Sequence, residues 1–167
     1  MVRRIATVFL STIVLGGVLC AQAPQPGSRS VTEVGPTSKF DPKRDPAQDL
    51  KAAITQAKAT HRRILLDVGG EWCTWCKYFD SFFEQNGTLR QYRDEHFVVV
   101  RVNFSKENEN KAFLSHYPKV PGYPHLFVLE NDGSFLYSQN TSELEQGKGY
   151  NLQAVSKFLR AWAKERS

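Results

Sequence analysis

The sequence predicts an α/β domain with a mixed central sheet, in which parallel strands are followed by an antiparallel hairpin and helices cover both faces. Helix-type and strand-type patterns alternate through the first part of the domain, which is typical of parallel strands joined by crossover helices. Two later apolar runs flank Asn131-Asp132-Gly133, a turn signal that predicts a β-hairpin. The length of 167 residues, with 41% hydrophobic and 23% charged side chains, suits a single domain of this kind.

The N-terminus has the pattern of a secretory signal peptide, which we assign to residues 1–23. Arg3 and Arg4 precede an apolar run over residues 5–19, and small and polar residues follow the run. This run is short for a bilayer core of about 30 Å, so cleavage is favoured over membrane anchoring. The sequence therefore predicts a periplasmic or secreted protein.

Two further features concern the end of the signal peptide and the segment that follows it. Cys20 stands where a lipidated cysteine would stand, but bulky Leu19 precedes it where that signal requires a small residue, so lipidation is the less favoured alternative. Residues 24–44 contain prolines and no sustained apolar period, which predicts a flexible arm. The folded domain is assigned to residues 45–167.

Capping signals and apolar patterns place the predicted elements of this domain. Asp45 is a preferred N-cap and Pro46 suits the first helical position, so a helix is expected to begin here. An apolar run over residues 63–68 predicts a buried strand, and a second helix is expected from about Cys73 to Asn86-Gly87. The later elements are a short helix capped by Thr88, a strand over 97–102, a helix over 105–117, hairpin strands over 125–129 and 134–137, and a helix from Asn151.

The segment Cys73-Thr74-Trp75-Cys76, at the start of the second predicted helix, indicates chemistry. Unpaired backbone N–H groups and the helix dipole favour an anion at this end of a helix, which lowers the pKa of Cys73. Cys73 is also expected to be the exposed sulfur, whereas Cys76 lies deeper within the first turn and can attack a mixed disulfide formed on Cys73. Taken alone, the same spacing also fits an inert bridge or half of a zinc site.

Composition and spacing exclude several other classes. A net charge of +5, spread along the chain, is too small to indicate nucleic-acid binding. Three cysteines are too few for the dense disulfide framework of a small secreted scaffold. A c-type haem site would require histidine directly after Cys76, and Lys77 stands there.

From residue 64 to residue 162 the chain resembles the thioredoxin family. Three landmarks match that family in order and spacing: Leu65-Leu66-Asp67, Glu71-Trp72-Cys73-x-x-Cys76-Lys77 and Val120-Pro121-Gly122-Tyr123-Pro124. The resemblance implies a thioredoxin-like fold, with the helices and mixed sheet described above. It also implies that the two cysteines are redox-active.

The resemblance implies further site residues. Pro124 matches the family's cis-proline that faces the disulfide, and Tyr123 would offer its backbone to an extended substrate segment. Asp67 matches the buried carboxylate behind the second cysteine, with a proton-transfer role, and Arg101 stands where the family often has a lysine. Trp72 and Trp75 are candidates for a substrate-facing surface. His125, next to Pro124, is expected to point away from the sulfurs.

The sequence also departs from thioredoxin itself. Thr74-Trp75 replaces glycine and proline between the cysteines, Ser81 stands near the place of the proline that kinks the active-site helix, and Gly70 leaves no aromatic shelf. The family's first strand is not evident, and residues 31–40 would supply it only weakly. These features are more similar to periplasmic members of the family, including the soluble domain of the transmembrane thiol reductase and bacterial disulfide isomerases.

The function predicted from the sequence is an exported thiol-disulfide oxidoreductase that needs no cofactor. Its partners would be protein disulfide or dithiol substrates and a membrane thiol-redox partner. Because Thr74 and Trp75 bring no positive charge to stabilise a thiolate, a reductant or isomerase is favoured over an oxidant. The alternative is a thioredoxin-fold module that binds a peptide or a copper ion without redox turnover.

Overall fold

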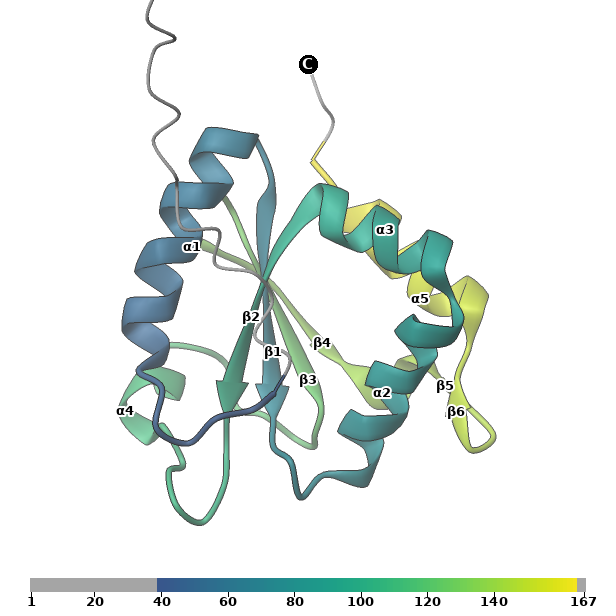
Figure 1. Cartoon of the computed structure of the whole chain (residues 1–167), viewed down its shortest axis with the longest axis horizontal. Coiled ribbons are helices and arrows are strands. Elements are labelled where there is room, and N and C mark those ends of the chain that lie inside the picture. The colour runs from purple at the N-terminus through teal and green to yellow at the C-terminus, as the bar shows by residue number, and fades with distance from the viewer. Residues whose placement is uncertain (1–38, 165–167) are drawn as a thin grey trace, which may run out of the picture. The chain divides into compact units, whose positions relative to one another are not determined.

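The computed structural model describes residues 39–164, so the assigned signal peptide, Cys20 and most of the arm lie outside the described residues. As far as β3, each strand of this part of the chain is preceded by one or two helices (Figure 1). The elements are α1 (Pro46–Thr60), β1 (Arg63–Gly69), α2 (Thr74–Gln85), α3 (Gly87–His96), β2 (Phe97–Asn103), α4 (Lys111–Leu114), β3 (His125–Leu129), β4 (Phe135–Asn140), the 3-10 helix η1 (Thr141–Leu144), β5 (Glu145–Gln146), β6 (Gly149–Tyr150) and α5 (Leu152–Trp162).

The main sheet has four strands in the order β2-β1-β3-β4. β1 and β2 are parallel, because the chain crosses over between them through α2 and α3, whereas β3 pairs antiparallel with both β1 and β4. The turn between β3 and β4 contains Gly133, whose φ of 91° is available to glycine at little steric cost. The mixed sheet and its hairpin, predicted from the sequence, are confirmed.

Alternation along the strands divides the core into two halves, because successive strand residues point to opposite faces. Figure 1 shows α1 and α4 on one side of the sheet and α2, α3 and α5 on the other. The strand residues that pack on the α1 side are Ile64, Leu66, Val68, Val98, Val100, Val102, Phe127 and Leu129. Those that pack on the α2 side are Leu65, Phe97, Val99, Leu126 and Val128. The predicted covering of both faces by helices is confirmed.

The predicted starts of three helices agree with the capping bonds. The Asp45 side chain accepts a hydrogen bond from the Ala47 N–H at the start of α1, and the Asn151 side chain accepts one from the Ala154 N–H at the start of α5. Cys73 occupies the N-cap position of α2. Each cap satisfies a backbone donor that a helix leaves unpaired at its first turn.

The helix predicted over residues 105–117 is wrong, since only α4 is helical there. Asparagine side chains hold the preceding loop in a different conformation. The Asn103 side chain donates to the Asn108 carbonyl, and the Asn108 side chain accepts from the Asn110 N–H. Asn110 itself has φ 47°, in the left-handed region. Such local bonds compete with helix formation, and they delay the helix until Lys111.

Two smaller differences concern turns between elements. The predicted cap at Thr88 is wrong, because α3 already begins at Gly87 with Asn86 at its N-cap position. The short antiparallel pair β5–β6, which no pattern in the sequence predicts, brings Tyr150 against α2. Among residues 39–164, no helix combines the length and apolar character needed to cross a membrane.

Candidate active site

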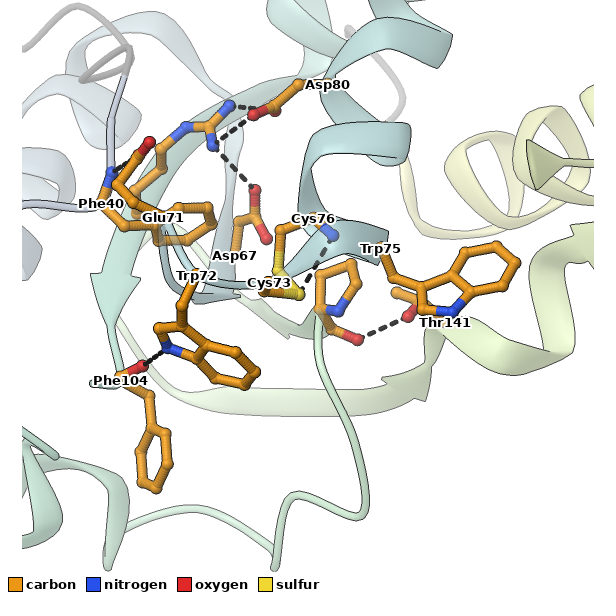
Figure 2. Close-up of a disulfide and its surroundings, with 12 residues drawn as sticks. Phe40, Asp67, Glu71, Trp72, Cys73, Trp75, Cys76, Asp80, Phe104 and Thr141 are labelled. Carbon is orange, nitrogen blue, oxygen red and sulfur yellow. Dashed lines mark hydrogen bonds and ion pairs between the residues drawn. A yellow bond between two sulfur atoms is a disulfide. The ribbon is translucent and has the colours of Figure 1, made fainter. Parts of the chain in front are cut away.

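Cys73 and Cys76 form a disulfide at the N-terminal end of α2, with their Cα atoms 5.2 Å apart (Figure 2). The Cys76 N–H points at the Cys73 sulfur, with a nitrogen-to-sulfur distance of 3.1 Å. This is the first-turn donor that would stabilise a thiolate at Cys73 in the reduced protein. Sequence reasoning expects Cys73 to be the exposed sulfur, but in the disulfide form both residues are buried, at 4% and 2% exposure.

The strand β1 supplies the floor beneath the disulfide. Leu65, Asp67 and Gly69 alternate with residues of the other face, so all three lie on the side covered by α2. Asp67 is 5% exposed, and Figure 2 shows its carboxylate between the disulfide and Asp80. Its Oδ1 atom has no hydrogen-bond partner among residues 39–164. A buried carboxylate with a free oxygen is suited to accept or release a proton beside the sulfurs.

Arg101 connects Asp67 with a second carboxylate. It pairs with Asp67 in the register of β1 and β2, and its Nη1 lies 3.9 Å from Asp67 Oδ2. The same guanidinium donates to both carboxylate oxygens of Asp80, one turn beyond Cys76 on α2. Arg101 therefore gives its close, bidentate contact to Asp80 and only a longer one to Asp67.

This arrangement leaves Asp67 with an unusual proton affinity. Burial raises the pKa of Asp67 from its ordinary value of 3.8 to about 6; Arg101 opposes the rise and Asp80 adds to it. A carboxyl group with this pKa exchanges protons close to neutral pH, the range in which cysteine thiols react.

The loop before β3 approaches the disulfide from the other side. The Tyr123–Pro124 bond is cis and Pro124 is buried, as the resemblance to thioredoxins predicts for this position. The Thr141 hydroxyl donates to the Pro124 carbonyl, which fixes the loop to η1. Tyr123 is partly buried and packs against the cluster of Cys73 and Cys76.

Trp72 and Trp75 lie on opposite sides of the disulfide in Figure 2. Trp72 is 57% exposed, yet its indole is held, because Nε1 donates to the Phe104 carbonyl at 2.7 Å. The Tyr123 ring stacks on Phe104 and meets Trp72 edge-on, with ring centres 4.7 and 5.7 Å away. The result is a fixed aromatic surface beside the sulfurs, in which the Trp72 ring is exposed and Phe104 and Tyr123 are partly buried.

Trp75 has a different environment. Its ring packs edge-on against Tyr150 and Tyr78, with centres 5.9 and 5.4 Å away, and the Tyr150 hydroxyl donates to its carbonyl at 3.3 Å. The unpredicted β5–β6 pair therefore supports the first turn of α2. Trp75 is half-buried, so it combines packing with a surface beside the disulfide.

A hollow of about 460 Å³ opens next to Trp72. Trp72 and Phe104 form its apolar wall, and Glu107 and Glu109 line it with carboxylates. Other hollows lie elsewhere, including one of about 650 Å³ beside α3 and α5. Within residues 39–164, no cluster of three or more histidine, cysteine or acidic side chains is arranged to hold a metal ion.

His125 points away from the disulfide, as expected. It shares a face of β3 with Phe127, which packs on the α1 side, and its Nε2 is 2.8 Å from the Ser138 hydroxyl. Burial lowers the pKa of His125 to about 4, with Glu143 opposing the shift. The neutral ring is therefore part of the core on the opposite face of the sheet.

Sequence reasoning missed two residues of the site, Asp80, which binds Arg101, and Phe40, which packs with the cysteines. Asp80 carries a detectable signal, because a residue four positions after Cys76 lies on the same helical face. Phe40, assigned to the arm before the domain, is 3% exposed and packs with Cys73 and Cys76. Its signal is weak: an aromatic side chain at the end of residues 31–40, the stretch that would supply the family's first strand only weakly.

The family described as thioredoxin-like matches residues 45–131. Among curated relatives, the thiol:disulfide interchange protein DsbD of Pseudomonas fluorescens is 30% identical over 130 residues, which are 76% of this chain and 20% of that protein. The protein of the same name from Pseudomonas sp. is 28% identical over 144 residues, 83% of this chain and 23% of the relative. The chain thus spans about a fifth of the length of these relatives.

Two solved structures extend the comparison to the fold. A disulphide isomerase from Xylella fastidiosa superposes with a TM-score of 0.59 at 25% identity, over 73% of this chain and 94% of the other. The oxidised C-terminal domain of DsbD from Neisseria meningitidis gives a TM-score of 0.53 at 23% identity, over 75% of this chain and 97% of that domain. At 23% identity, the similarity to this second structure is one of fold alone.

Proposed function

Because the chain belongs to the thioredoxin-like family, we propose that it is an exported thiol-disulfide oxidoreductase that acts through Cys73 and Cys76. The observation that carries the proposal is the disulfide at the N-terminus of α2, directly above a buried carboxyl group on β1. An inert bridge would need neither the helix terminus nor Asp67. The names of the relatives, thiol:disulfide interchange protein and disulphide isomerase, support the same chemistry.

In the proposed reaction the reduced protein transfers two electrons to a client disulfide. The Cys73 thiolate attacks one client sulfur, so the client S–S bond breaks, a bond between Cys73 and the client forms, and the released client sulfur takes a proton from water. Cys76 then gives its proton to Asp67 and attacks the Cys73 sulfur. The mixed bond breaks, the disulfide between Cys73 and Cys76 forms, and the second client sulfur leaves as a thiolate, which takes a proton from water.

The aromatic surface beside the sulfurs is proposed to position the client. Trp72 presents a fixed apolar face, and the backbone of Tyr123 would pair with an extended client segment, as in β-strand addition. Trp75 would border the same segment on the other side. Pro124 offers no N–H group that could compete for the sulfurs.

The direction of electron flow is proposed to be reductive or isomerising. A strong oxidant needs groups that stabilise its thiolate, and Thr74 and Trp75 provide no charge. A carboxylate at Asp67 would oppose a nearby thiolate and accept the proton when the disulfide re-forms. Outside the cytoplasm, such a protein would draw its electrons from a thiol partner in the membrane.

Reduction of insulin disulfides by the purified protein, with a small thiol as donor, tests the proposed activity. We expect turnover well above the uncatalysed rate, and loss of this excess in the Cys73→Ser variant. A protein that binds peptides with its disulfide intact but does not accelerate insulin reduction would instead be a binding module.

A further inference from the structure

We propose that Phe40 is a positioning residue of the redox site, whose ring closes the buried side of the Cys76 sulfur and keeps solvent and external reagents from it. The inference rests on the proposed function, because it concerns the same pair of sulfurs. It assigns a part in the site to a residue that precedes α1 and lies outside the three sequence landmarks.

The first support is the packing of Phe40. Phe40 is 3% exposed and belongs to a separate small cluster with Cys73 and Cys76, bordered by Trp75 and Tyr123. Neither of the two larger core clusters, on the two faces of the sheet, includes Phe40. Phe40 is therefore packed with the two cysteines and not within either half of the main core, and Figure 2 shows the ring on the Asp67 side of the sulfurs.

The second support is the space at Gly69, the last residue of β1. A Cβ atom added there would lie 2.6 Å from Cys76 Sγ and 2.9 Å from Phe40 Cζ. Both atoms therefore lie close to the position that a Gly69 side chain would occupy, although Cys76 belongs to α2 and Phe40 to the segment before α1. The missing side chain at Gly69 is what lets the Phe40 ring and the Cys76 sulfur come together.

The third support is the way in which the segment is held. The Phe40 N–H donates to Glu71 Oε1 at 2.8 Å, and the Asn108 side chain donates to the Pro42 carbonyl at 2.9 Å. The Arg101 guanidinium lies over the Phe40 ring, 4.8 Å from its centre. Phe40 is thus anchored to Glu71, two residues before Cys73, and to Arg101, the cation that faces Asp67.

The consequence is a difference in reactivity between the two sulfurs. Their exposure does not explain it, because both cysteines are buried in the disulfide. With the Phe40 ring in place, attack from solvent can reach Cys73 only, and Cys76 reacts only with the sulfur of Cys73. Exclusion of water by the ring also contributes to the burial that raises the pKa of Asp67. Both effects favour resolution of the mixed disulfide over side reactions of Cys76.

The test measures how readily iodoacetamide labels Cys76. It uses the Cys73→Ser variant, in which Cys76 is the one thiol of the redox pair that remains. Rates over a range of pH separate the reactivity of the fully ionised thiol from its pKa, and peptide mass spectrometry locates the label. We expect Phe40→Ala to raise the limiting rate roughly tenfold, because reactivity follows exposure, and Phe40→Leu to stay close to the parent. Phe135→Ala, at an exposed aromatic remote in the fold, is the matched control and should leave the rate unchanged.

A second pair of variants keeps the core intact. Glu71→Ala removes the acceptor of the Phe40 N–H and should raise the labelling rate, whereas Glu71→Gln keeps an acceptor and should not. Unchanged labelling of Cys76 in Phe40→Ala, or an equal rise in Phe135→Ala, would overturn the proposal. Failure of insulin reduction by the parent protein would count against the proposed function, while labelling would still decide the role of Phe40.

Discussion

Arg101 and Asp67 face each other across the pairing of β1 and β2, with Nη1 3.9 Å from Oδ2, although Arg101 forms its close contacts with Asp80. This division of one cation between two carboxylates leaves Asp67 buried and only partly neutralised. Ionising Asp67 therefore costs free energy in the folded state and not in the unfolded state. This cost should appear in the pH dependence of both stability and reactivity.

The first prediction concerns stability against pH in the oxidised protein. Burial raises the folded-state pKa of Asp67 from 3.8 to about 6, so the folded protein binds this proton more tightly than the unfolded chain. The resulting stabilisation is fully present below about pH 4, and it is lost as pH rises through about 6. Asp67→Asn should remove this loss, and raise the free energy of unfolding at pH 7 by up to about 3 kcal/mol. Urea denaturation at pH 4 and pH 7 measures the difference. Identical pH slopes in parent and variant would contradict the raised pKa.

The second prediction separates the two cysteines. Cys76→Ser should accumulate mixed disulfides with client proteins, because Cys73 can attack but nothing resolves the product. Cys73→Ser should trap little, because the remaining sulfur lies behind the Phe40 ring. Non-reducing gels of both variants after exposure to oxidised clients give the measurement. Equal trapping by the two would show that the sulfurs are interchangeable.

The third prediction concerns Gly69. Gly69→Ala should lower the free energy of unfolding by about 1 to 3 kcal/mol, since its Cβ has no room between Cys76 and Phe40. Gly87→Ala is the matched control, because nothing lies within 4 Å of its added Cβ and alanine favours a helix. Thermal unfolding of the two oxidised variants compares them. If Gly69→Ala leaves the free energy of unfolding unchanged, the side chains around the Cys76 sulfur can move to accommodate a Cβ atom without cost.

The fourth prediction tests the exposed aromatic surface. Trp72→Ala should slow mixed-disulfide formation with peptide clients several-fold while changing the melting temperature little, because an exposed ring adds little to the core. Leu152→Ala, at a residue 51% exposed on α5, is the control and should leave the rate unchanged. If Trp72→Ala exchanges with peptides as fast as the parent, the indole is not part of the client surface.

The fifth prediction is the reduction potential. On a scale where thioredoxin lies near −270 mV and the oxidant DsbA near −120 mV, we expect a value in the more reducing half. His125, which could have stabilised a thiolate, lies on the opposite face of the sheet, so it does not weaken this expectation. Equilibration with glutathione, followed by quantification of the dithiol, gives the potential. A value near the oxidant end would reverse the proposed electron flow.

The sequence by itself determined the elements whose signals are local. The cap at Asp45, the β-branched run over 97–102 and the turn around Gly133 act over a few residues, and the structure follows each of them. The position of Cys73 at the junction of a strand and a helix is of the same kind. These features depend on backbone bonds and side-chain periodicity within one segment, which a single sequence displays.

Only the tertiary structure decided what surrounds the sulfurs. Phe40, Asp67 and Arg101 come from three segments distant in sequence, and the burial that raises the pKa of Asp67 exists only once they meet. Local asparagine bonds delay the helix at α4, but the Asn108 side chain that takes part in them also donates to the Pro42 carbonyl, and this contact joins segments distant in sequence. Desolvation and long-range hydrogen bonds are properties of the packed chain, so no local pattern in the sequence carries them.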